Sequence, residues 1–202
     1  MGRFSEARAA LVSSRALYAK SGAGFDWAIA AWPAGLIEMI AGDPAAAERE
    51  LTGGYQALRA MGEHAYRASI AAMLADAVYA QGRLAQAQRL ADEARQVAVN
   101  GDTDAHTRWR AISAKLLARR GQFPAALELA DQALALIPAS SHGGPLRAEL
   151  LTAKAEVLRL AGKPSDAEAC LRQALDIYTE CHAVSLAERT RSTLASLGTG
   201  PR

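Results

Sequence analysis

The sequence predicts an all-α fold, a right-handed α-solenoid of about five helix hairpins with a period of about 40 residues and a C-terminal capping helix. A Gly recurs once in every period, and an Ala follows each one five positions later. The pairs are Gly2/Ala7, Gly42/Ala47, Gly82/Ala87, Gly121/Ala126 and Gly162/Ala167. A repeat of this length indicates stacked helix pairs that bury a continuous core between neighbours.

Small residues at two further offsets share the same register. The twelfth residue after each Gly is Ser14, Gly54, Ala94, Ala133 or Ala174, and the seventh before it is Gly35, Ala75, Ala114 or Ala155. Because small side chains allow two helices to approach closely, we expect these positions to mark helix crossings. Composition agrees: hydrophobic residues make up 50% of the chain and aromatic residues 5%, which suits many thin Ala/Leu seams.

Glycine and proline set the expected helix ends. Pro44, Pro124 and Pro164 fit a first helical turn, and the repeat glycines fit a left-handed C-terminal cap. The second helices of the pairs are predicted at 3–19, 44–61, 84–99, 123–137 and 164–181. The first helices are predicted at 26–41, 65–81, 103–120 and 145–161, and breaker-rich linkers lie at 21–24, 61–62, 100–102 and 140–144.

One domain is expected to cover residues 1–202. Residues 1–20 would form the second helix of an incomplete first repeat, and 184–197 a capping helix. The helix pairs between them are expected at 25–61, 64–100, 103–138 and 145–181.

Two consecutive units carry a recognisable pattern. Its residues are Leu74, Ala75, Val78, Gly82, Ala87, Ala91 and Ala94 in one unit, and Gly121, Ala126, Ala130, Ala133 and Pro138 in the next. The pattern resembles the tetratricopeptide repeat family, although the period is longer than that family's and its Trp near the start of the unit is absent. The resemblance implies helix hairpins that bind protein partners.

Two runs, 41–51 and 74–83, are similar to the tails of bacterial multidomain adenylate/guanylate cyclases that carry an ATPase module, and of LuxR-type transcriptional regulators. This resemblance implies a protein-interaction scaffold in bacterial signalling or transcriptional regulation. It implies no enzymatic activity, because the catalytic modules of those families lie outside this sequence. The alternative is a truncated regulatory or sensor arm of such a protein.

The repeat register separates a groove-facing stripe from a packing stripe on the first helices. Positions 13, 10, 6, 3 and 2 before each Gly should face a concave groove. The candidate partner-binding residues there are Ile29, Trp32, Leu36, Met39, Asp76, Tyr79, Arg108, Lys115, Arg119, Glu149, Glu156 and Arg159. The packing stripe should include Ile70, Met73, Val78, Trp109, Ile112, Leu116, Leu117, Leu150 and Val157.

The groove stripe changes from apolar to charged along the chain, which suits a peptide with an apolar anchor and acidic groups beyond it. The basic residues Arg108, Lys115 and Arg119 also fit a solvated helix face. The apolar patch around Trp32 and Leu36 could instead be covered by upstream sequence or by a second copy of the chain, giving a homodimer.

Other function classes lack their motifs. The net charge of +2, from 23 basic and 21 acidic residues mixed along the chain, gives no footprint for nucleic acid or a membrane surface. No phosphate-binding loop is present, and the four His are too dispersed for a metal or cofactor site. Cys170 and Cys181 lie too far apart on one helix to pair. Without a signal peptide, the chain is expected to be cytoplasmic.

The register makes Ala126 a test of the predicted crossing. Replacing Ala126 by Leu should lower the free energy of unfolding by about 1–3 kcal/mol, because the added atoms overpack the helix seam. Thermal unfolding followed by circular dichroism measures the change. An unaltered melting temperature would contradict the repeat register.

Overall fold

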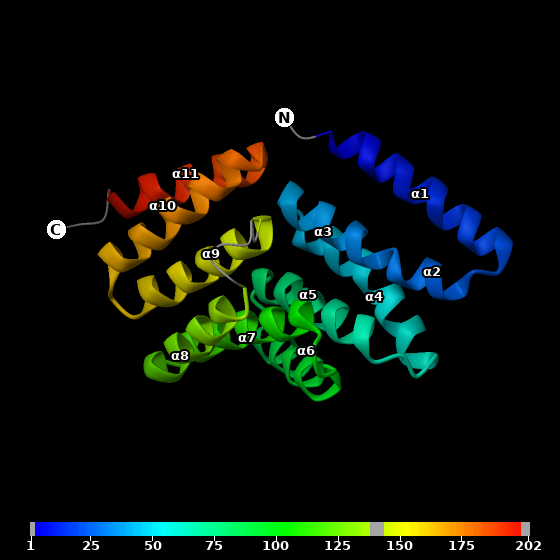
Figure 1. Ribbon diagram of the computed structural model, residues 1–202, viewed down its shortest axis with the longest axis horizontal. Coiled ribbons are helices and arrows are strands. Elements are labelled where there is room, and N and C mark those ends of the chain that lie inside the picture. The colour runs from blue at the N-terminus through cyan, green and yellow to red at the C-terminus, as the bar shows by residue number, and fades with distance from the viewer. Residues whose placement is uncertain (1–2, 138–143, 199–202) are drawn as a thin grey trace. The chain divides into compact units, whose positions relative to one another are not determined.

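The computed structural model describes residues 3–137 and 144–198. This part of the chain contains helices and turns but no strand, and the all-α solenoid class is confirmed. Figure 1 shows the helices in chain order. They group into two compact units, Gly2–Trp109 and Arg110–Arg202, and the division falls inside the helix Thr103–Arg119.

The N-terminal unit is a stack of helices. It contains α1 (Phe4–Ser21), α2 (Gly24–Ile29), α3 (Ala31–Ala41), α4 (Pro44–Ala60), α5 (Ala65–Ala80), α6 (Leu84–Val97) and the start of α7 (Thr103–Arg119). Each helix packs on its neighbours in sequence: α3 on α4, α4 on α5 and α5 on α6, while α1 lies against α2 and α3.

The C-terminal unit continues the same pattern. After the end of α7 it contains α8 (Phe123–Ala135), α9 (Gly144–Leu160), α10 (Pro164–Glu180) and α11 (Val184–Gly198). Helix α9 packs on both α8 and α10, and α11 packs on α10. The predicted helices all appear, with ends close to the prediction except at the helix expected at 26–41. The linker residues 138–143 lie outside the described part.

The helix predicted at 26–41 is in fact two helices, and this prediction was wrong. Helix α2 ends at Ile29, and α3 starts at Ala31 after a turn at Ala30. Pro33 explains the break, because it has no N–H to donate to the carbonyl of Ile29 and its ring crowds that carbonyl.

The predicted seams are buried. Solvent does not reach four of the alanines that lie five residues after a repeat Gly, which are Ala47, Ala87, Ala126 and Ala167. The same holds for two residues at the twelfth position after a repeat Gly, Ala94 and Ala174. In the C-terminal unit, Ala126 belongs to a core cluster with Ala114, Ala118, Ala130 and Val157, which joins α7, α8 and α9. The predicted packing stripe is also buried, except that Leu117 is only partly covered.

Left-handed residues end the helices as expected. Gly82, which follows the turn after α5, has φ 79°, a conformation that glycine adopts without steric cost. The turn between α10 and α11 uses His182 instead, at φ 54°. His182 is the only non-glycine residue with positive φ in the described part of the chain.

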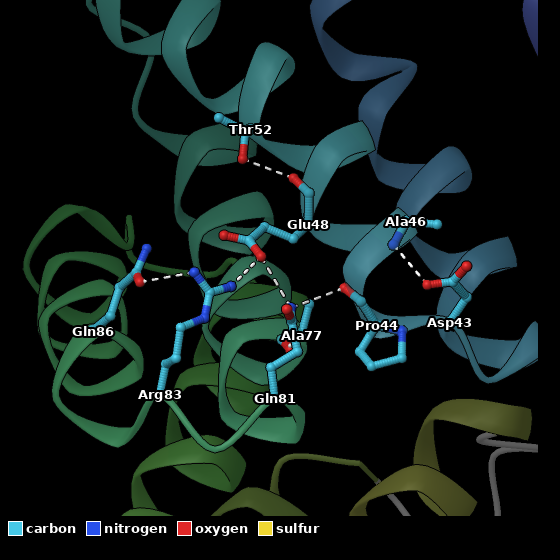
Figure 2. Close-up of polar contacts among 9 residues, drawn as sticks. All are labelled: Asp43, Pro44, Ala46, Glu48, Thr52, Ala77, Gln81, Arg83 and Gln86. Carbon is cyan, nitrogen blue, oxygen red and sulfur yellow. Dashed lines mark hydrogen bonds and ion pairs between the residues drawn. The ribbon is translucent and has the colours of Figure 1, made fainter.

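A polar network joins consecutive hairpins in the N-terminal unit (Figure 2). Glu48 of α4 accepts hydrogen bonds from Gln81 (2.9 Å) and from Arg83, both beside the turn that follows α5. The same Gln81 amide also donates to the carbonyls of Pro44 and Ala77. Burial alone would raise the pKa of Glu48, but these hydrogen bonds and the charge of Arg83 outweigh it, so the pKa is lowered.

Gly54 and its neighbour Gly53 provide a matched test of the closest helix crossing. A Cβ at Gly54 would collide with the carbonyl oxygen of Ala28 and the Cβ of Ala31, whereas one at Gly53 would meet only the Trp27 ring, at 3.3 Å. Gly54→Ala should therefore lower the free energy of unfolding by about 1–3 kcal/mol. Gly53→Ala should cost much less, because the Trp27 ring has to move by only a few tenths of an ångström and Ala has the higher helix propensity.

Urea unfolding of both glycine variants measures the difference. Equal stabilities for the two would contradict the close approach of α4 to α2 and α3.

Glu48→Gln should lower the free energy of unfolding at pH 7 by about 0.5–1 kcal/mol, since it removes the charge that Arg83 binds. Because folding lowers the pKa of Glu48, its stabilising effect is present above the unfolded-state pKa of about 4.3 and is lost as pH falls through the folded-state value. The difference between variant and wild type should thus shrink between about pH 5 and pH 3. Urea unfolding across this range measures it.

Glu128→Gln is the control for that experiment, because Glu128 is exposed and accepts only from a neutral Gln132 on its own helix. If the difference in the free energy of unfolding between Glu48→Gln and the wild type stays constant with pH, the role of the ion pair between Glu48 and Arg83 is contradicted.

Candidate functional site

The N-terminal unit contains a cavity of about 790 Å³. Five segments line it: α1, α2, the start of α3, the first turn of α5, and the start of α7 with the residue before it. The lining residues are Leu11, Ser14, Tyr18, Asp26, Ile29, Ala30, Trp32, Pro33, Ala65, Tyr66, Ser69, Asp102 and Asp104. We call this cavity the N-terminal pocket.

Helix α1 supplies one wall. Leu11, Ser14 and Tyr18 are three and four residues apart, so they lie on one face of the helix. Two ion pairs hold α1 in place. Arg8 donates from Nε (2.7 Å) and Nη2 (2.6 Å) to the buried carboxylate of Glu38 on α3, and Arg15 pairs with Glu50 on α4.

The break between α2 and α3 forms the part of the pocket nearest Trp32. Ile29, Ala30, Trp32 and Pro33 all line the cavity there, so the irregularity imposed by Pro33 lies in the pocket itself. The guanidinium carbon of Arg108 lies 5.7 Å from the centre of the Trp32 ring, within cation–π range. Asp104 accepts from Arg108 Nε at 2.8 Å and fixes that position.

The first turn of α5 supplies a further wall with Ala65, Tyr66 and Ser69. Tyr66 is 48% exposed, and its ring meets Phe25 edge-on with centroids 5.7 Å apart. With Tyr18 and Trp32, it gives the pocket three aromatic side chains from three separate helices.

The charged residues of the lining are all acidic. Asp26 comes from α2, Asp104 from the first turn of α7, and Asp102 from the residue before that helix. Asp102 Oδ1 accepts a hydrogen bond from the backbone N–H of Ala105 (3.0 Å), which caps α7. Among the described residues that line the pocket, none has a basic side chain.

The pocket brings together only part of the predicted stripe. Ile29 and Trp32 line it, with Arg108 stacked on the latter. Leu36 and Met39 lie farther along α3 and do not line it. The side chains of the apolar patch are each partly buried within the chain.

On α5, the predicted groove residues Asp76 and Tyr79 lie outside the pocket lining. Tyr79 is buried, with 7% of its surface exposed, so it offers a partner little surface.

The remaining predicted residues belong to the C-terminal unit. Arg119 and Glu156 form an ion pair with each other (3.2 Å), which the sequence did not suggest. Glu149 adds to the effect of burial in raising the pKa of Tyr178. Lys115 is half-buried on α7, and Arg159 is exposed in the last turn of α9.

The sequence did not predict several lining residues, because the groove stripe was taken to begin only 13 residues before each repeat Gly. Asp26 and Tyr66 both lie sixteen residues before a repeat Gly, and Asp104 lies seventeen before Gly121. One further helical step along the same face would have found all three. The contribution of α1 had no signal in the stripe, because the stripe was defined on the predicted first helices and the sequence assigned α1 to the second helices.

The described residues include no group of three or more His, Cys, Asp or Glu side chains placed to hold a metal ion. In the same part of the chain, no helix is both long and apolar enough to cross a membrane. Burial raises the pKa of the Cys170 thiol, which disfavours the reactive thiolate.

Comparison with known proteins agrees with the repeat architecture. Residues 109–180 match a tetratricopeptide repeat model. The fold is similar to the crystal structure of BtubC (BKLC) from P. vanneervenii, with a TM-score of 0.58 and 14% sequence identity over 99% of this chain and 93% of that one. No curated protein matches the sequence. The chain is thus a tetratricopeptide-like helical repeat.

Proposed function

We propose that the protein is a non-catalytic interaction module that binds a segment of a partner protein in the N-terminal pocket. The observation that carries this proposal is the pocket itself, an aromatic-lined cavity whose volume falls in the range typical of ligand sites. Tetratricopeptide repeats generally mediate protein–protein interaction, and the matched region, residues 109–180, extends from within α7 to the end of α10 in the C-terminal unit.

The proposed cellular context is bacterial signalling or transcriptional regulation, in the cytoplasm. It is supported by the resemblance of segments 41–51 and 74–83 to the tails of multidomain cyclases and LuxR-type regulators. A regulatory arm that works only beside catalytic or DNA-binding domains is the alternative. Both readings assign the same task to the pocket, which is to hold a partner.

A second copy of the chain is a weaker candidate for the partner. The sequence offers a homodimer through the apolar patch that contains Trp32 and Leu36 as one of two ways to cover it, but both side chains are partly covered within one chain. Less apolar surface is therefore left for a homodimer than the sequence suggested. A peptide segment that enters the cavity needs no such extended surface.

The proposal is tested by selecting binders to the immobilised chain from a display library of random peptides. Each peptide is about 12 residues long, which is more residues than a cavity of this size can hold. We expect enriched peptides whose affinity, measured by fluorescence anisotropy, falls at least 10-fold with Trp32→Ala, because Trp32 lines the pocket. The matched control is Trp27→Ala, which removes an equally large indole outside the lining. Its effect should be less than 3-fold.

Two results would contradict the proposed function. One is the absence of any enriched peptide. The other is equal weakening by both Trp variants, provided that circular dichroism shows both to be folded.

A further inference from the structure

We propose that the partner segment bound in the N-terminal pocket is basic, with a Lys or Arg side chain next to an apolar residue. This inference rests on the proposed function and specifies the chemistry of the partner. The combination that supports it is an apolar, aromatic cavity whose charged lining residues, Asp26, Asp102 and Asp104, are all carboxylates.

Two of these carboxylates retain the capacity to bind a cation. Asp104 is engaged by Arg108. Asp102 uses one oxygen to cap α7, but a carboxylate can accept about four hydrogen bonds, so most of its capacity remains. In the described part of the chain, no basic side chain forms an ion pair with Asp26 or Asp102.

The aromatic lining suits the same ligand chemistry. The faces of Tyr and Trp rings attract ammonium and guanidinium groups, most strongly where water is excluded. The protein's own Arg108 already lies over Trp32 in this way. Tyr18 and Tyr66 offer further rings in the pocket, and Leu11 and Ile29 provide apolar contacts for the aliphatic stem or for a neighbouring apolar residue.

The charge also disfavours an acidic segment in this pocket, at the end of the groove where the sequence suggested the apolar anchor of a peptide whose acidic groups lie beyond it. An acidic segment would bring its carboxylates close to Asp26 and Asp102, which form no ion pair in the described part of the chain, and this costs free energy in a partly enclosed site. Arg108, the basic residue expected to meet such a partner here, is held by Asp104 against Trp32. It therefore lies against Trp32 and is not among the residues that line the pocket.

The volume sets the length of the bound segment. A cavity of about 790 Å³ has room for a few side chains and not for a whole helix, so we expect a short motif to enter it. A basic side chain flanked by one or two apolar residues fits this space.

The test starts from the peptides enriched on the wild-type chain. We expect them to carry Lys or Arg, and versions with these residues replaced by Glu should bind at least 10-fold more weakly to the wild type. Because only the peptide changes, this comparison does not depend on how a variant folds. Affinity for the basic peptides should also fall as salt is raised.

The protein side is tested with the double variant Asp26→Asn/Asp102→Asn, which removes two charges. Asn at position 102 can still cap α7, so the helix should be retained. We expect affinity for the basic peptides to drop at least 5-fold, with a weaker salt dependence. The control is Asp43→Asn, since Asp43 is likewise an N-cap residue, of α4, but lies outside the pocket.

The outcomes distinguish the two proposals. If neutral or acidic peptides are enriched and need Trp32, the pocket binds peptides but the partner is not basic, and this inference is overturned. Basic peptides that bind the double variant as tightly as the wild type also overturn it. If no peptide is enriched, the proposed function itself fails, and the inference with it.

Discussion

Close approach of helices at small residues is the constraint on which this structure depends. At Gly54 the backbone of α4 meets the backbone of α2 so closely that even a methyl group has no space. The later seams use Ala at the equivalent position, and Ala94 and Ala174 are completely buried. With few large aromatic side chains to fill a core, such thin seams keep the apolar surface of each hairpin out of water.

The N-terminal pocket arises where this regular packing is interrupted. Pro33 cannot complete the helical hydrogen bond to Ile29, so the first helix of that pair is divided at Ala30, and the residues on both sides of the break line the cavity. Helix α1 has no buried residue, and ion pairs from Arg8 to the buried Glu38 and from Arg15 to Glu50 join it to α3 and α4. Because α1 packs less closely on its neighbours than the later helices do, a cavity remains beside it.

Polar contacts and the chemistry of the pocket are separate features of the same unit. Glu48, Gln81 and Arg83 connect consecutive hairpins on a surface away from the pocket lining, where they add stability and set the turn after α5. Inside the pocket, the charged side chains come from segments far apart in the sequence. Their shared negative charge is the basis of the proposed preference for a basic partner segment.

The sequence by itself determined the fold class, the order of the helices and nearly every helix boundary, because the signals involved are local. Gly82 ends a helix through its own backbone conformation, and Ala126 marks a seam through its own small size. The identity of the site was decided only by the tertiary structure. Tyr18, Asp26, Tyr66 and Asp102 belong to separate segments of the chain, and they share one cavity because α1 packs against a helix that Pro33 breaks. A periodic sequence pattern does not predict this packing. The pattern reports the spacing of residues along one helix, whereas the cavity depends on the space between different helices.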